Sequence, residues 1–197
     1  MSNVLTLSGE IIWVIGIVAW YVIRYPFERR AKRIRIVSSR RSPSERVGLV
    51  SALFGLAICP AFYVATGFPG AADRPASVWA IVLGTILFGA ALVLFRISHK
   101  QLGRNWSVTL EIREKHKLVS GGPYRLIRHP MYTSFLLMAL GQAFLLSNWL
   151  VAVAGLVGFA ILFFPRIGKE EQMMIENFGP QYLAYMERTK RLIPYVY

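Results

Sequence analysis

Two stretches of the sequence hold side chains that could bind a charged ligand. Residues 118–132 read LVSGGPYRLIRHPMY, which places His129 and Tyr132 at the start of an apolar run. The second stretch follows a later apolar run and contains Arg166, Glu170 and Glu171. Carboxylates and a guanidinium together can bind a ligand that has both an amine and a carboxylate, because each charge meets its opposite. We therefore expect a site for a zwitterionic molecule where the two stretches meet.

The elements that must position these side chains are apolar helices. Of the 197 residues, 55% are hydrophobic, and the mean hydropathy is +0.45. A chain of this length encloses too little interior to hide so many apolar side chains, so the surplus must face lipid. The sequence predicts an all-α integral membrane protein with about five transmembrane helices and C-terminal cytoplasmic amphipathic helices. The expected spans are residues 11–23 (extended back to 5), 47–68, 78–95, 131–146 and 149–164.

The fourth and fifth spans are expected to form a tight hairpin, since the two residues between them, Ser147 and Asn148, carry no charge. Antiparallel helices return the chain to the face from which it started. Residues 128–132 should therefore lie near residues 166–171. Beyond the hairpin, 166–177 is expected as an amphipathic helix and 181–190 as a second short helix. The alternating residues 106–112 predict a short extended strand.

The charge distribution predicts the orientation in the membrane. A net charge of +13 would indicate nucleic acid binding in a soluble protein, but here the basic residues flank apolar runs, so we expect no nucleic acid partner. With the N-terminus outside and five crossings, 22 of the 23 basic residues lie on the cytoplasmic side, and only Arg74 lies outside. We expect the site to face the cytoplasm. The compact chain suggests a prokaryotic inner membrane.

Metal and dinucleotide chemistry have little support in the sequence. Cys59 is the only cysteine, so the chain can form neither an intrachain disulfide nor a thiolate cluster. The spacing of His99, His116 and His129 fits no i, i+4 metal pair, and no metal ligand is predicted. No G-x-G-x-x-G follows a predicted strand, so the sequence lacks the fingerprint of a dinucleotide-binding site.

The polar motifs, taken together, resemble the isoprenylcysteine carboxyl methyltransferase family, whose wider group includes the phospholipid N-methyltransferases. The motifs are HKLV at 116–119, GPY at 122–124, RHPMY at 128–132, the pair Glu170 and Glu171, and FGPQYLAY at 178–185. The resemblance covers 102–194, and the first three spans match only in hydropathy. We expect one membrane domain, 1–197, with three spans in 1–97 and a catalytic half in 98–197 that holds the helical hairpin 131–164 and the C-terminal helices.

The resemblance implies a methyltransferase that binds S-adenosylmethionine at the cytoplasmic face in a non-Rossmann cofactor site, which fits the absence of a G-x-G-x-x-G motif. It implies that Arg166 orients the acceptor's carboxylate. The acceptor would be an amphiphilic small molecule or a lipidated molecule that arrives from the surrounding lipids. The residues implied to bind the cofactor are His116, Lys117, Leu118, Val119, Tyr124, His129, Pro130, Met131, Tyr132, Glu170 and Glu171.

Two positions depart from the family pattern. Ser134 stands where many members have a glycine, and we expect its side chain to reshape the lipid-side tunnel. Thr109 aligns loosely with a glutamine of eukaryotic members, which leaves open the cofactor's polar contacts there.

Other functions fit some of these features. Methylation of a phospholipid amine is the near alternative within the same enzyme class, and Arg166 favours the carboxylate. A membrane reductase would share the C-terminal pattern but would use a nicotinamide cofactor and a longer chain. A membrane scaffold that retains the fold without catalysis is the alternative that is not an enzyme.

Overall fold

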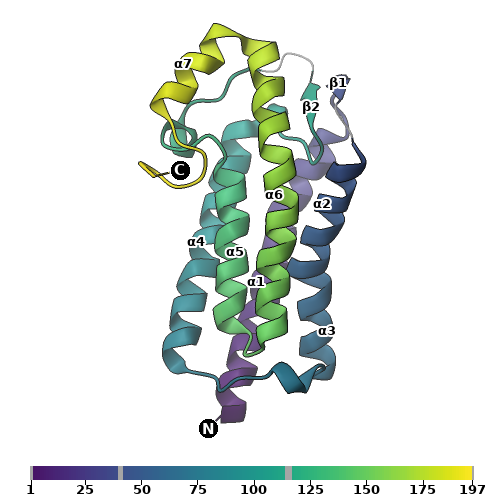
Figure 1. The fold of residues 1–197 in the computed structure, drawn as a ribbon, viewed down its shortest axis with the longest axis vertical. Coiled ribbons are helices and arrows are strands. Elements are labelled where there is room, and N and C mark those ends of the chain that lie inside the picture. The colour runs from purple at the N-terminus through teal and green to yellow at the C-terminus, as the bar shows by residue number, and fades with distance from the viewer. Residues whose placement is uncertain (1, 40–41, 114–116, 197) are drawn as a thin grey trace.

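The computed structural model of this chain is an elongated bundle of long helices, which Figure 1 shows with the N-terminus and α7 at opposite ends. It describes residues 2–39, 42–113 and 117–196. In chain order the elements are α1 (Ser2–Ala31), β1 (Ile36–Ser39), α2 (Pro43–Leu53), a π turn (Phe54–Ile58), α3 (Cys59–Thr66), a 3-10 turn (Gly70–Ala72), α4 (Val78–Leu102), a 3-10 turn (Gly103–Asn105), β2 (Glu111–Arg113), a 3-10 turn (Gly122–Arg125), α5 (Pro130–Leu145), α6 (Trp149–Phe178) and α7 (Pro180–Arg188).

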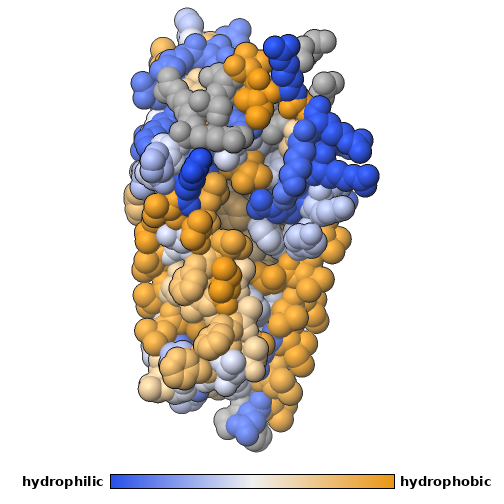
Figure 2. All heavy atoms as spheres, turned by 90° about the vertical axis from the view of Figure 1, so that its right-hand side faces the viewer, coloured by the Kyte–Doolittle hydropathy of each residue, from blue (hydrophilic) through white to orange (hydrophobic). Residues whose placement is uncertain are grey.

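The expected all-α membrane architecture is confirmed. Four helical rods are long and apolar enough to cross a membrane, namely Asn3–Ala31, Pro43–Thr66, Val78–Leu102 and Trp149–Phe178. The remaining apolar helix, α5, has 16 residues and is shorter than a full span usually requires. Hydrophobic side chains cover the long flank of the bundle in Figure 2, and hydrophilic ones gather at the end that carries β1, β2 and α7 in Figure 1. The bundle therefore has an apolar body and a polar head.

The hairpin of α5 and α6 forms at the uncharged turn that the sequence predicts. Asn148 caps α6, since its side-chain oxygen accepts a hydrogen bond from the Val151 backbone N–H at 3.1 Å. The amide nitrogen of the same side chain donates to Pro69 O at 2.9 Å and to Asp73 Oδ1 at 2.8 Å. One residue thus starts α6 and ties the hairpin to the α3–α4 connection.

The end of α6 differs from the prediction of a fifth span that stops at 164 and a separate polar helix at 166–177. The structure has one helix of 30 residues that passes through Pro165. A proline in a helix removes one backbone hydrogen bond but does not require the helix to end. The polar residues beyond it remain helical because they find partners across the bundle: Arg166 Nη2 donates to Val108 O at 2.8 Å, and Glu171 pairs with Arg128 at 2.8 Å.

The predicted strand at 106–112 was also wrong in extent. Only Glu111–Arg113 is extended, and it pairs antiparallel with β1, with an irregular register between Ile36 and Ser38. The partner strand, β1, has four residues and lies in the short α1–α2 connection. It can therefore pair with only a few residues of the 106–113 segment. Residues 106–110 are irregular instead and lie against the bundle. The second C-terminal helix, expected at 181–190, is α7 at Pro180–Arg188.

Candidate active site

The candidate site lies at the polar head, where α5 begins and α6 has returned. Pro130 is the first residue of α5, and its fixed φ suits that position, so the preceding His129 stands directly at the helix start. The segment after α7 runs alongside: Arg128 N donates to Lys190 O at 2.7 Å, and His129 N donates to Arg191 O at 3.0 Å. Two backbone hydrogen bonds thus fix the position of His129 from outside the hairpin.

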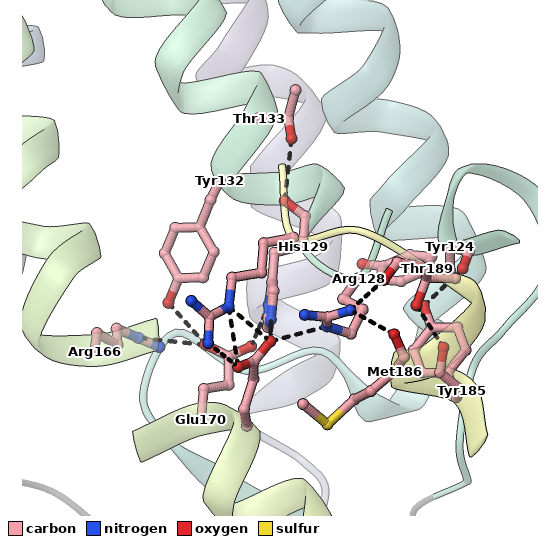
Figure 3. A network of polar contacts seen from close by, with 12 residues as sticks. Tyr124, Arg128, His129, Tyr132, Thr133, Arg166, Glu170, Tyr185, Met186 and Thr189 are labelled. Atoms are coloured by element: carbon pink, nitrogen blue, oxygen red, sulfur yellow. Dashed lines mark hydrogen bonds and ion pairs between the residues drawn. The ribbon is translucent and has the colours of Figure 1, made fainter. Parts of the chain in front are cut away.

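Glu170 lies at the centre of the polar contacts in Figure 3. Tyr132 donates its hydroxyl to Glu170 Oε2 at 2.7 Å. His129 Nδ1 lies 3.5 Å from Glu170 Oε1, and Arg166 Nε lies 3.8 Å from Oε2. The structure therefore brings three of the predicted residues, from α5, α6 and the position before α5, around the carboxylate of a fourth.

Glu171, the neighbouring carboxylate, has a different environment. Arg128 Nε lies 2.8 Å from its Oε1, and Arg191 Nη2 lies 2.8 Å from its Oε2. His129 Nε2 is 3.4 Å from Oε1. Only 5% of the Glu171 side chain is exposed. Arg128 also donates to the carbonyl oxygens of Met186 and Thr189, so this ion cluster joins α5, α6 and the end of α7.

The protonation of His129 follows from its two acidic neighbours. Burial by itself lowers the pKa of His129, but Glu170 and Glu171 outweigh burial and hold that pKa above its ordinary value. Tyr185 donates its hydroxyl to Tyr124 O at 2.6 Å, and burial raises the pKa of Tyr185 to about 12. Burial likewise raises the pKa of Tyr124 well above its ordinary value. The two carboxylates therefore favour the charged form of the histidine, and the two tyrosines keep their protons at neutral pH.

Arg166 binds the wall of the site with two of its three nitrogens. Nη2 donates to Val108 O at 2.8 Å, and Nη1 lies 3.3 Å from Glu45 Oε1. The same Glu45 oxygen accepts the Leu110 backbone N–H at 2.8 Å. The third nitrogen, Nε, is buried and has no hydrogen-bond partner in the described part of the chain. Arg166 and Glu45 thus fasten residues 108–110 to the bundle and leave one guanidinium donor unsatisfied.

A cavity of about 560 Å³ opens beside these residues. Its polar part includes Tyr132, Arg166 and Glu170, and its apolar part includes side chains of α1, α2, α5 and α6. Of the residues predicted to form the site, Pro130 and Glu171 do not line it, and His116 lies outside the described residues. Those that line it are Lys117, Leu118, Val119, Tyr124, His129, Met131, Tyr132, Arg166 and Glu170.

Three charged residues that shape the site are absent from the sequence-based prediction. Glu45 belongs to α2 and is 5% exposed, while Arg128 and Arg191 flank Glu171. Glu45 did carry a signal, because it stands three residues after Ser42, whose hydroxyl accepts the Glu45 N–H at 3.3 Å as a helix cap. An acid at the start of an apolar helix needs a cation nearby, but the sequence does not identify that cation.

The two departures from the family pattern lie in different places. Ser134 is fully buried, does not line the cavity and donates its hydroxyl to Met131 O of its own helix at 2.6 Å. Thr109 does line the cavity, and its hydroxyl donates to Glu111 Oε1 at 2.5 Å. Thr109 is therefore the departure that can alter contacts with a ligand.

Comparison with known proteins places this site in a family. Residues 81–176 match the model of the isoprenylcysteine carboxyl methyltransferase (ICMT) family. Residues 81–176 are therefore similar to the isoprenylcysteine carboxyl methyltransferase family. The matched region contains His129, Tyr132, Arg166 and Glu170, whereas Glu45 lies outside it.

Individual relatives agree with the family. The chain is 36% identical over 118 residues to protein-S-isoprenylcysteine O-methyltransferase B of Arabidopsis thaliana, covering 59% of this chain and 56% of the relative. It is 31% identical over 126 residues to protein-S-isoprenylcysteine O-methyltransferase of Xenopus laevis, covering 63% and 44%. A solved structure of the eukaryotic intramembrane Ras methyltransferase ICMT superposes with a TM-score of 0.55 at 26% identity, covering 80% of this chain and 54% of that one. The chain thus spans about half the length of the methyltransferases it matches.

Proposed function

We propose that this chain is an S-adenosylmethionine-dependent membrane methyltransferase that methylates the carboxylate of a lipid-like, isoprenyl-type acceptor. The observation that carries the proposal is one continuous cavity with a polar part around Glu170 and an apolar part between the spans. A polar donor and an amphiphilic acceptor can meet in such a cavity. The relatives named as isoprenylcysteine O-methyltransferases support the same chemistry.

The residues of the polar part suit the cofactor. The volume of about 560 Å³ lies within the range of roughly 300–1,000 Å³ that small-molecule pockets occupy. Arg166 Nε is buried without a hydrogen-bond partner in the described part of the chain, and such an atom is costly unless a ligand or water satisfies it. In the proposed complex, Glu170 and Tyr132 hold the cofactor's polar groups, while Leu118, Val119 and Met131 form the wall.

The proposed reaction asks the protein to align two molecules and exclude water. Bound S-adenosylmethionine supplies a methyl group on a sulfonium, and transfer to a carboxylate oxygen returns the C–S bonding pair to sulfur as a neutral thioether. An ionised carboxylate already has the lone pair that attacks, so no residue has to remove a proton. Alignment of the acceptor oxygen with the methyl group is the main contribution left to the chain. Arg166 is proposed to orient the acceptor carboxylate through its charge and its unsatisfied Nε.

The acceptor is proposed to reach the site from the bilayer, with its chain among the apolar side chains. Leu49, Leu53 and Leu56 of the second rod and Phe135 and Met138 of α5 line this part of the cavity. The chain is proposed to have its N-terminus outside and its polar head in the cytoplasm, in a prokaryotic inner membrane. The basic residues support that orientation, since the predicted topology puts 22 of the 23 in cytoplasmic segments of the sequence.

Calorimetric titration of the detergent-purified protein with S-adenosylhomocysteine, with NADPH as the parallel ligand, tests the proposal. We expect saturable micromolar binding of S-adenosylhomocysteine and none of NADPH. Transfer of a labelled methyl group to N-acetyl-S-farnesylcysteine then tests the acceptor class. Binding of NADPH alone would favour a reductase, binding of neither by folded protein would favour a scaffold, and methylation of a phospholipid amine instead of the acid would overturn the choice of carboxylate.

A further inference from the structure

Arg24 is a second guanidinium in the cavity wall, and the proposed reaction does not use it. It is the first charged residue after the apolar run of α1, so it stands where the helix leaves the apolar layer. Its side chain is 21% exposed, and its Nε donates to Glu28 Oε2 at 3.1 Å. The guanidinium carbon lies 5.2 Å from the centre of the Trp20 ring and 5.8 Å from that of Trp106. Two aromatic rings therefore hold this cation at the cavity.

The other basic residues that line the cavity are less available to an anion. Within the described residues these are Lys117, Arg128 and Arg166. Arg128 donates to Glu171 and to two backbone carbonyl oxygens, and Arg166 already faces two carboxylates, those of Glu45 and Glu170. Lys117 is exposed to solvent. Among the described residues, the hydrogen bond and ion pair found for Arg24 engage only its Nε, which leaves its two terminal nitrogens for a ligand.

The charge around Arg24 also favours an anion. Its one acidic partner, Glu28, is shared with Lys32, whose Nζ lies 3.2 Å from Glu28 Oε1. Two cations and one anion leave a net positive charge at this part of the wall. Trp20, which lines the cavity too, has a buried indole N–H without a hydrogen-bond partner in the described part of the chain. An anion bound here would receive charge-assisted hydrogen bonds from Arg24 and a further one from the indole.

We propose that Arg24 and the Trp20 indole N–H bind the carboxylate end of the acceptor and select acids over neutral analogues. The inference rests on the proposed function and adds an acceptor-binding residue from α1, outside the family-matched region 81–176. Trp106 links the two parts of the cavity, because its ring contacts Arg24 and its segment is fastened to Arg166 through Val108. Arg24 thus supplies binding of the acid, while Arg166 keeps its proposed orienting role.

Steady-state kinetics with N-acetyl-S-farnesylcysteine test the assignment, with its carboxamide as a neutral competitor. For Arg24→Gln we expect an acceptor KM at least tenfold higher, kcat within about twofold and unchanged affinity for S-adenosylhomocysteine, since the lost charge-assisted contact holds the acid equally in the ground state and the transition state, while Arg166 still orients the attacking oxygen. Inhibition by the carboxamide should not change. Arg24→Lys should have a KM between those of wild type and Arg24→Gln, because it keeps the charge. Trp20→Phe, which keeps a ring beside Arg24, should raise KM about two- to fivefold. Arg30→Gln removes the same charge from an exposed position of the same helix and should have no effect.

Several results would overturn the assignment. An unchanged KM for Arg24→Gln would do so, and so would an equal loss of affinity for the acid and the carboxamide, which would indicate a merely structural effect. The activity can also be measured in vesicles that contain either phosphatidylglycerol or phosphatidylcholine. If the variants change only the preference of the activity for phosphatidylglycerol, the guanidinium binds lipid phosphate instead. Should Arg24→Gln fail to bind S-adenosylhomocysteine for lack of folding, Arg24→Lys and Trp20→Phe decide the question. Failure of the proposed function is separate, because the wild-type protein would then methylate no acid.

Discussion

Adjacent glutamates in α6 have separate tasks. Glu170 lines the cavity and its side chain is 28% exposed, whereas Glu171 is 5% exposed and lies among Arg128, Arg191 and His129. One residue step along a helix turns a side chain by about 100°, so neighbours face different surroundings. We therefore propose that Glu170 binds the ligand and that Glu171 joins α5, α6 and the C-terminal segment.

Substitution of Glu170 by Gln tests its assignment to the ligand. We expect the Kd for S-adenosylhomocysteine to rise at least tenfold, since a charged acceptor of hydrogen bonds is lost from the site. The unfolding temperature should change by no more than a few degrees. Calorimetric titration and thermal unfolding in detergent measure the two effects. Glu187→Gln, an exposed position of α7, is the matched control, and normal binding by Glu170→Gln would refute the assignment.

Substitution of Glu171 by Gln should have the opposite pattern. The buried cations Arg128 and His129 would lose their shared carboxylate, and breaking a buried ion pair from one side costs roughly 3–5 kcal/mol. We expect a clear fall in the unfolding temperature, with cofactor affinity retained at temperatures where the protein remains folded. A Glu171→Gln variant as stable as wild type would show that the cluster does not hold the polar head together.

The pH dependence of stability should report on His129. Its pKa is raised above the ordinary 6.5 in the folded protein, so protonation favours folding. The stabilisation is fully present below about pH 6.5 and is lost as the pH rises through the folded-state pKa. The stability advantage of wild type over His129→Gln should therefore shrink with rising pH, measured by thermal unfolding from pH 5.5 to 9. A difference that stays constant across this range would contradict the prediction.

At the scale of elements, the second rod, Pro43–Thr66, shows how a helix long enough to span a membrane can contain a proline in its interior. A π turn at Phe54–Ile58 precedes Pro60, and in that register the Gly55 carbonyl would need the N–H that Pro60 lacks. Gln142 supplies the missing donor from α5, with Nε2 at 2.9 Å from Gly55 O, and it also accepts a hydrogen bond from Trp13 Nε1 at 3.2 Å. A buried amide thus satisfies the irregular backbone where water is absent.

The close approach of the second rod to α6 depends on glycine at position 55. A Cβ added there would lie 2.1 Å from Ala154 O, a backbone atom that can move only with its helix. We expect Gly55→Ala to destabilise the protein by about 1–3 kcal/mol through overpacking. Gly89→Ala in α4 is the control, since nothing lies within 4 Å of its added Cβ, and it should be neutral or slightly stabilising. Unfolding in mixed micelles compares the two, and equal stability of both variants would contradict the packing argument.

The sequence was informative about these elements where the pattern is local. The α5–α6 hairpin followed from two apolar runs and an uncharged turn, and the start of the fourth apolar run at 131 lies one residue from the observed start of α5. The continuation of α6 past Pro165 did not follow, because a change from apolar to polar residues marks the end of the apolar layer and not the end of the helix. The pairing of Arg166 with Glu45 could not be predicted either, since it depends on how α2 packs against α6.

At the scale of the molecule, the polar head and the basic residues share one end of the bundle. The opposite end carries Arg74, which donates to the carbonyl oxygens of Ala143 and Leu146 and lies over the Trp149 ring. Arg74 therefore caps the outer turn of the hairpin. Because cytoplasmic loops carry the excess of Lys and Arg in membrane proteins, this asymmetry supports the proposal that the site faces the cytoplasm.

Cysteine labelling in spheroplasts tests that orientation. Cys59 is the only native cysteine, so Cys59→Ala gives a background free of thiols. Ala71→Cys places a reporter in the exposed α3–α4 connection, and Glu187→Cys places one in exposed α7. We expect a membrane-impermeant maleimide to label the first in intact spheroplasts and the second only after detergent is added. The reverse pattern would put the polar head outside the cell, away from cytoplasmic S-adenosylmethionine, and would therefore count against both the orientation and the proposed activity.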